Sequence, residues 1–120
     1  MDYERFCSQI LRIDSKIRFA SVYDEWANRV GGGMREGVES LLSDHAEKEL
    51  VSLSIMDWKS RKDTSKWLGK TKYTLAEYDT IKRLSFYLGN DYLLLVSCEK
   101  ETDTNMVVDE VIRLYYENQE

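Results

Sequence analysis

The sequence has no proline, one histidine and two cysteines. His45 alone cannot form a multi-histidine zinc site, and two cysteines cannot supply the missing ligands. Cys7 and Cys98 lie far apart within apolar segments, which indicates buried free thiols rather than a disulfide or a redox pair. The absence of proline predicts short connections between regular elements.

Long apolar runs are also missing, because no stretch approaches the roughly 18 residues that a membrane-spanning helix needs. Met1 is followed by charged residues and not by the apolar segment of a signal peptide. The net charge of −5 and the isoelectric point near 5.0 argue against a protein that binds nucleic-acid phosphates. We therefore expect a cytoplasmic protein with neither a membrane nor a nucleic acid as partner.

The composition of the sequence predicts one globular domain that spans residues 1–120. Hydrophobic residues make up 42% of the 120 positions, which is ordinary for a domain that folds on its own. Apolar spacing predicts an α/β domain of the α+β type, in the order helix, two strands, helix, three strands, helix. A single five-stranded antiparallel sheet follows, with the first and last helices on one face and the middle helix on the other. These elements are expected at residues 2–13, 17–23, 28–34, 45–62, 70–78, 80–88 and 92–98, with the last helix beginning at 102–103.

The middle helix is the least certain element of this pattern. A short helix is expected over 35–42, followed by a break and then the longer helix over 45–62. Val51 to Ile55 alternates with period two, as a strand would. We favour a helix because two apolar stripes recur there at helical spacing. The stripes are Leu50, Leu53 and Met56, and Val51, Ile55 and Trp58.

Three adjacent glycines, Gly31–Gly33, stand between a predicted strand and the predicted short helix. They either let two backbones approach closely or, with Arg35, form a cradle for an anion. The spacing lacks a dinucleotide-binding fingerprint, and Glu36 would repel an anion. We favour close packing and keep Gly32, Gly33 and Arg35 as candidate anion contacts.

Other local patterns carry weaker signals. Gly69-Lys70-Thr71 imitates the end of a phosphate-binding loop but lacks its first glycine. Basic residues gather at 59–72, which is typical of a solvated helix end and less so of an anion site. Trp26 lies at a predicted hairpin tip, where it either packs under its own chain or contacts a partner.

The order of elements from Phe6 to Leu114 resembles that of the Roadblock branch of the profilin-like folds. The segments Ile13–Ala20, Gly32–Gly37 and Leu68–Tyr73 are similar to those of a family of small archaeal proteins of uncharacterised activity. The Roadblock resemblance implies homodimerisation through the middle helix and the edge strand after it. For prokaryotic members it also implies regulation of small Ras-like GTPases.

Two apolar stripes on one helix are more than one sheet face can cover, so one stripe needs a partner. Together with the resemblance, this predicts a dimer interface comprising Val51, Ile55, Trp58, Tyr73 and Leu75. We find no catalytic constellation, and we expect no enzyme and no cofactor. The sequence thus favours a homodimeric interaction module that regulates or scaffolds a small GTPase or another signalling partner. The alternative is a PAS-like or profilin-like sensor, which a cavity of roughly 300 Å³ or more, lined by Tyr and Trp, would favour.

Overall fold

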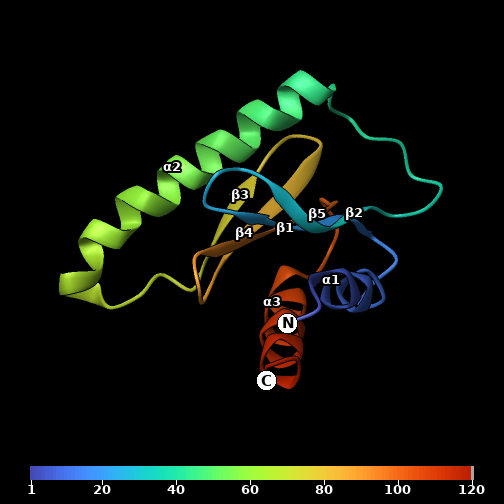
Figure 1. Ribbon diagram of the computed structural model, residues 1–120. Helices are drawn as coiled ribbons and strands as arrows, with labels where there is room; N and C mark the ends of the chain where they lie inside the picture. The colour runs from blue at the N-terminus through green and yellow to red at the C-terminus, as the bar shows by residue number, and fades with distance from the viewer. Residues whose placement is uncertain (120) are drawn as a thin grey trace.

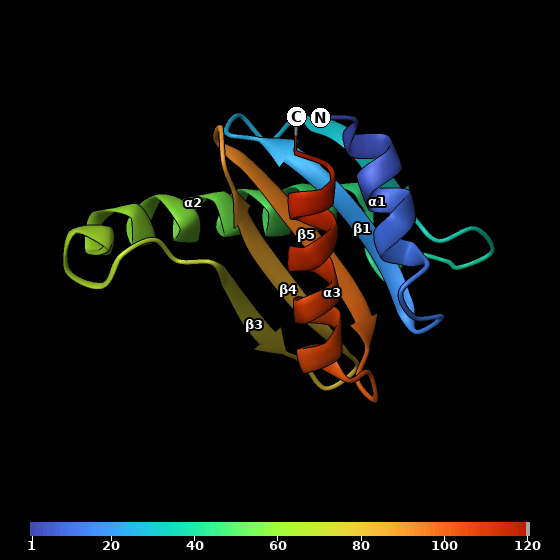
Figure 2. The same ribbon diagram turned by 90° about the horizontal axis from the view of Figure 1, so that it is seen from below.

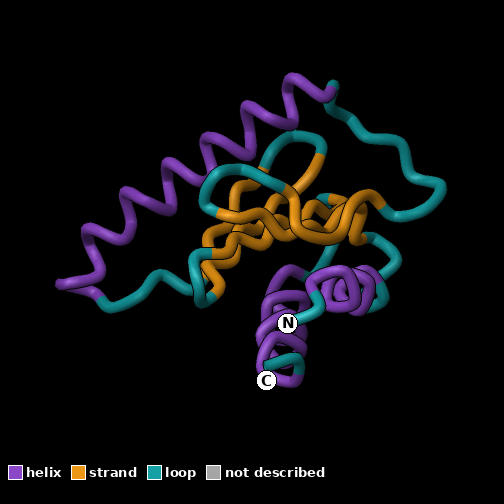
Figure 3. The backbone as a smooth tube through the Cα atoms, in the orientation of Figure 1, coloured by secondary structure: helices purple, strands orange, loops and turns teal. Residues whose placement is uncertain are grey.

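A computed structural model of the chain, which describes residues 1–119, has three layers. A five-stranded antiparallel sheet lies between α2 on one face and α1 with α3 on the other (Figures 1 and 3). This arrangement confirms the predicted fold class and the predicted face of each helix. The elements are α1 Tyr3–Leu11, β1 Ile17–Asp24, β2 Arg29–Met34, α2 Asp44–Leu68, β3 Tyr73–Glu77, β4 Ile81–Leu88, β5 Tyr92–Glu99 and α3 Thr104–Glu117.

The strand order is β2-β1-β5-β4-β3. β5 is the central strand, and its run Leu93–Val96 is buried on both faces of the sheet. β1 pairs with β5 although they are far apart in sequence, which joins the first hairpin to the three-strand meander. β2 and β3 are the two edges.

Each helix begins at a side chain that satisfies a free backbone N–H group. Asp2 accepts from the N–H of Arg5 at 3.0 Å, and Ser43 accepts from that of Ala46 at 3.1 Å. Asp103 does the same for α3. At the other end of α2, Gly69 adopts φ +82°, and its N–H donates to the Ser65 carbonyl at 2.8 Å. The helix therefore stops where the chain needs a left-handed residue.

The two faces of the sheet carry separate apolar clusters. On the α1 and α3 side, Phe6, Ile10, Val107 and Val111 pack on inward side chains of β1, β4 and β5. On the α2 side the cluster is smaller, consisting of Phe19, Tyr23, Val51, Ile55, Trp58, Leu93 and Leu95. The sheet is thus covered more extensively on the α1 and α3 face than on the α2 face.

Two local predictions were wrong. Residues 35–43 form a loop and not a short helix, because Arg35 and its neighbours are held by β1 and the α1–β1 connection. α2 continues to Leu68, six residues beyond the expected end at 62. The strand alternative for Val51–Ile55 is also excluded, since this segment lies within α2.

Candidate functional site

The two stripes of α2 have different environments. Val51, Ile55 and Trp58 are only 3%, 6% and 5% exposed, because they pack on the sheet. Trp58 also stacks on Tyr87 of β4, with ring centroids 6.2 Å apart. The expectation that Val51, Ile55 and Trp58 form the dimer contact is therefore corrected: their own sheet covers them.

The outward stripe of α2 carries the apolar surface that the sheet leaves uncovered. Leu53 and Met56 are 58% and 63% exposed. After Trp58 no residue of α2 is buried, and the helix extends past the β3 edge of the sheet (Figure 2). Trp67 and Leu68 at its end are strongly exposed. Residues 59–68 of α2 therefore contribute no buried side chain to the core.

Strand β3 adjoins that surface and pairs only with β4. Its register places Tyr73 opposite Phe86 and Leu75 opposite Leu84, so both side chains point to the α1 and α3 face. Both are partly exposed at the edge. On the α2 face, a groove of about 170 Å³ separates helix and strand. The groove is lined in part by Leu50, Leu53, Thr74, Ala76 and Tyr78.

Charge is distributed unevenly along α2. Its first half carries Asp44, Glu47 and Glu49 against Lys48 alone. Its second half carries Lys59, Arg61, Lys62 and Lys66 against Asp57 and Asp63. The helix is thus acidic at its beginning and basic at its end. Within the chain, Arg61 pairs with Asp57 and Lys62 with Asp91, both at 2.9 Å, so the basic segment is partly neutralised.

The three glycines lie inside β2 and not between a strand and a helix, which corrects their predicted setting. A Cβ on Gly31 would lie 2.8 Å from the backbone of Glu4 in α1, and one on Gly32 would lie 2.1 Å from the Ala20 carbonyl oxygen. Close packing is therefore their role, but the helix they accommodate is α1. The Gly32 N–H donates to the Glu4 carboxylate at 2.9 Å, so the chain supplies its own anion there.

Arg35 is likewise used within the chain. Its Nε donates to the Ile17 carbonyl at 2.7 Å, and one Nη donates to the carbonyls of Leu11 and Asp14. These contacts tie β2 to the α1–β1 connection. Arg35 and Gly32 are therefore structural in this fold. A Cβ added at Gly33 would lie 3.6 Å from a guanidinium nitrogen of Arg29, which itself pairs with Glu47.

Trp26 lies at the β1–β2 hairpin tip and is 73% exposed. The Asp24 carboxylate holds the turn by accepting the N–H groups of Trp26 and Asn28, each at 2.9 Å. The Lys59 ammonium of α2 lies 5.8 Å from the indole centroid. Trp26 is therefore not packed beneath its own chain, and it remains a candidate partner contact.

Cys7 and Cys98 belong to the apolar cluster on the α1 and α3 face of the sheet, whereas His45 lies on α2 over the other face. Burial raises the pKa of Cys7 to about 12, with a further contribution from Glu4, and burial also raises the pKa of Cys98. His45 is exposed, and its Nε2 lies 3.2 Å from a carboxylate oxygen of Glu49 on α2. No group of three or more potential metal ligands occurs within residues 1–119. In the same range, no helix has the length and apolar composition needed to cross a membrane.

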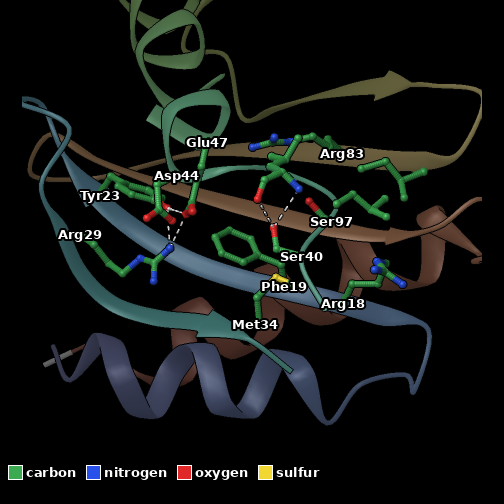
Figure 4. A pocket seen from close by; sticks show the side chains of 13 residues that line it. Arg18, Phe19, Tyr23, Arg29, Met34, Ser40, Asp44, Glu47, Arg83 and Ser97 are labelled. Carbon is green, nitrogen blue, oxygen red and sulfur yellow. Dashed lines mark hydrogen bonds and ion pairs between the residues drawn. The ribbon is translucent and has the colours of Figure 1, made fainter. Parts of the chain in front are cut away.

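A hollow of about 240 Å³ lies beneath the N-terminal end of α2 and the 35–43 loop (Figure 4). On one side of it, Arg29 donates to Glu47 and to the Tyr23 hydroxyl. Arg83 and Ser97 line its floor. The sequence interpretation missed these two residues, although alternation over 81–88 puts Arg83 on the same face as Ile81 and Tyr87.

A second hollow, of about 360 Å³, lies between the second half of α2 and the β4–β5 turn. Trp58 and Tyr87 line it, as a sensor pocket would require, together with Arg61 and Lys62. Both cations already have carboxylate partners. Lys70 also lines this hollow, and no carboxylate of residues 1–119 pairs with it.

This three-layer arrangement, with its five strands in the order β2-β1-β5-β4-β3, is the fold of Roadblock/LC7 domains. The chain superposes on the Roadblock/LC7 domain from Streptomyces avermitilis with a TM-score of 0.73 and 12% identity, over 98% of this chain and 94% of that one. Myxococcus xanthus MglB gives a TM-score of 0.73 and 13% identity, over 96% and 89%. The gliding protein MglB from Thermus thermophilus gives 0.70 and 13%, over 97% and 92%. At these identities the likeness shows the fold. No protein-family model and no curated protein matches the sequence.

Proposed function

We propose that this chain is a non-enzymatic, cytoplasmic interaction module that forms a homodimer through the outer face of α2 and the β3 edge. One observation carries the proposal: α2 extends past the sheet with Leu53, Met56 and Trp67 exposed, beside an edge strand with free backbone groups. A second copy related by a two-fold axis would cover the helix and extend the sheet in one contact.

The charge distribution of α2 supports the geometry of this contact. Two helices related by a two-fold axis perpendicular to them run antiparallel, so the acidic first half of one lies beside the basic second half of the other. Opposite charges at the rim of an interface favour one orientation more than they add affinity. The proposed interface residues are now Leu53, Met56 and Trp67, with Tyr73 and Leu75 kept at the strand edge.

The proposed partner of the dimer is a small GTPase or another signalling protein, which the dimer would regulate or hold in place. This part rests on the Roadblock resemblance, and the exposed Trp26 at the hairpin tip is a suitable anchor for such a contact. Among the similar structures is an MglB with a tetrameric arrangement, at a TM-score of 0.71 and 14% identity. Self-association of that protein supports, by analogy, self-association here.

Light scattering coupled to gel filtration tests the dimer. We expect a mass of about twice the 14.1 kDa of one chain. The double variant Leu53→Glu, Met56→Glu should give a folded monomer, because it places charges on the proposed contact without touching the core. Tyr116→Glu is the matched control, since Tyr116 is exposed on α3, on the opposite face of the sheet. A clean monomer for the unmodified protein at micromolar concentration contradicts the dimer.

The GTPase part needs its own measurement. GTP hydrolysis by a small GTPase of the same organism would be followed with and without the unmodified protein and the Trp26→Ala variant. A change in rate that Trp26→Ala reduces supports the proposal. An unchanged rate together with no complex on gel filtration removes the GTPase and leaves the dimer in place.

A small-molecule sensor is the second candidate. The hollow in Figure 4 suggests it, although this hollow has about 240 Å³ and no Trp in its lining and so falls short of the size and lining that the sequence interpretation required. That hollow is lined by the inner face of the first turns of α2, whereas the proposed dimer uses the outer face. The two functions are therefore compatible in one molecule.

A further inference from the structure

We propose that the hollow beneath the N-terminal end of α2 binds a small monocarboxylate with a short apolar chain, and that Arg83 is the group that recognises its carboxylate. The proposal deepens the sensor candidate and does not depend on the dimer. It rests on the register of the sheet, on the size of the hollow and on the surroundings of Arg83.

The floor of the hollow is one row of side chains across four strands. Met34 of β2 pairs with Phe19 of β1, Phe19 with Ser97 of β5, and Ser97 with Arg83 of β4. Paired residues in antiparallel strands have side chains on the same face. The row therefore presents an apolar half, Met34 and Phe19, and a cationic end, Arg83, separated by a small hydroxyl side chain.

The hollow exists because α2 crosses the sheet beside this row and not over it. Val51, Ile55 and Trp58 pack around Leu93 and Leu95, which precede Ser97 on the same face of β5. Ser97 is too small to fill the space that is left. The 35–43 loop closes the row from above with Ser40, Leu41 and Leu42, and Ile81 adds to the apolar wall.

Arg83 is a partly buried cation that lacks a close counterion. Among residues 1–119 no carboxylate lies within 4.0 Å of its guanidinium, and none of its N–H groups donates a hydrogen bond to another described residue. Burial lowers its pKa, although Tyr78, Tyr23 and Glu47 act in the opposite direction from a distance. Leaving such a charge uncompensated destabilises the free protein. A bound carboxylate would remove that cost.

The other cations of the hollow are already engaged. Arg29 is held by Glu47 and Tyr23, and Arg18 donates to the Glu39 carbonyl at 2.9 Å. Arg18 keeps further N–H groups that make no hydrogen bond within residues 1–119, but among the three arginines of the hollow only Arg83 has no hydrogen-bond partner in that range. Its planar fork can bind both oxygens of one carboxylate.

Size and charge narrow the ligand class. A volume of about 240 Å³ equals roughly eight water molecules at about 30 Å³ each, which is room for about eight non-hydrogen atoms. The lining carries Arg18, Arg29 and Arg83 against Asp44 and Glu47, so the excess of one positive charge suits a ligand with one carboxylate and not one with several negative charges. A nucleotide is thus both too large and too anionic, whereas a six-carbon monocarboxylate fits.

The test uses hexanoate and the unmodified full chain. Amide chemical shifts in a ¹⁵N correlation spectrum would be followed during titration with hexanoate, acetate and hexylamine. We expect saturable shifts at Ser97, Arg83 and Leu42 with hexanoate, with a dissociation constant of about 1 mM or lower. Acetate should bind at least tenfold more weakly because it leaves the apolar wall unfilled, and hexylamine should not bind because Arg83 repels it.

Four variants assign the interaction to named groups. Arg83→Met should abolish hexanoate binding while leaving the protein as stable as before or more so. Arg83→Lys keeps the charge but not the fork and should bind about tenfold more weakly. Ser97→Val fills the hollow and should block binding with Arg83 intact. Arg5→Gln removes an exposed arginine from α1, on the other face of the sheet, and should bind as the unmodified protein does.

Several outcomes would overturn the proposal. These are the absence of saturable shifts with hexanoate, equal binding by Arg83→Met, and equal binding by acetate. Arg83 also borders the groove between α2 and β3. If Arg83→Met removes dimerisation and leaves hexanoate binding unchanged, Arg83 belongs to the interface and the ligand assignment is wrong.

Discussion

Replacing Gly32 with alanine is expected to destabilise the fold through two separable effects. Gly32 has φ +89°, a conformation that costs a residue with a Cβ about 1–2 kcal/mol. The added Cβ would also lie 2.1 Å from the Ala20 carbonyl oxygen and 2.8 Å from the Cys7 sulfur. Overpacking of this kind typically costs about 1–3 kcal/mol. The sum is about 2–5 kcal/mol, a large part of the roughly 5–15 kcal/mol by which a domain is stable.

Two neighbouring glycines separate the effects. Gly37 has φ +80°, and a Cβ added there would meet nothing within 4 Å, so Gly37→Ala carries the backbone cost alone, about 1–2 kcal/mol. Gly31 has no positive φ, but its Cβ would lie 2.8 Å from the backbone of Tyr3 and of Glu4. Gly31→Ala therefore carries the packing cost alone, about 1–3 kcal/mol.

Urea unfolding followed by tryptophan fluorescence measures all three variants against the unmodified protein. Gly32→Ala should lose about as much free energy of unfolding as the other two combined. Its melting temperature should fall by roughly 8–20 °C, taking about 4 °C per kcal/mol for a chain of this size. The reasoning is refuted if Gly32→Ala is no less stable than Gly37→Ala, because the contact with β1 and α1 would then be without effect.

Two further outcomes are expected. Trp58→Ala should lower the free energy of unfolding in urea by about 3–5 kcal/mol, because Trp58 is buried between α2 and the sheet. Leu53→Ala, measured in the monomeric state, should change it by no more than about 0.5 kcal/mol, and similar values for both would contradict the assignment of the two stripes. Partial burial acts to raise the pKa of Asp24, but hydrogen bonds from Asn28 and Trp26 lower it on balance. Because the folded pKa is the lower one, the stabilisation is present above the unfolded value of about 4 and is lost as the pH falls through the folded value. The stability difference between the unmodified protein and Asp24→Ala should therefore shrink between pH 7 and pH 3, and a constant difference would contradict it.

Much of the architecture follows from local patterns. The alternation in β1 and β4, the nearly unbroken apolar run of β5 and the amphipathic spacing of α1 and α3 identify these elements and the faces they bury. The sequence also predicts the helical spacing of α2 and the two apolar stripes on this helix. Periods of 2 and 3.6 residues can be recognised in the sequence without knowing which element packs against the strand or helix.

Which stripe of α2 faces the sheet depended on tertiary structure. Helical spacing is satisfied equally by Val51, Ile55 and Trp58 and by Leu50, Leu53 and Met56. Only the packing around Leu93 and Leu95 of the sheet selects the first set. For a similar reason, the sequence alone did not determine which helix packs against Gly31–Gly33. α1 precedes β2 by some twenty residues, and the contact with Glu4 arises from the packing of the helix on the sheet and not from neighbouring sequence.

The hollow that Arg83 lines is the feature of this structure that the sequence predicts least. It requires the register of β2, β1, β5 and β4 to be known together, because a shift of one residue in any pairing would place Met34, Phe19, Ser97 or Arg83 on the opposite face from its neighbour. Alternation within one strand determines which side chains share a face. The alignment of four strands, and the path of α2 across them, decides which of those side chains meet and where space remains between them.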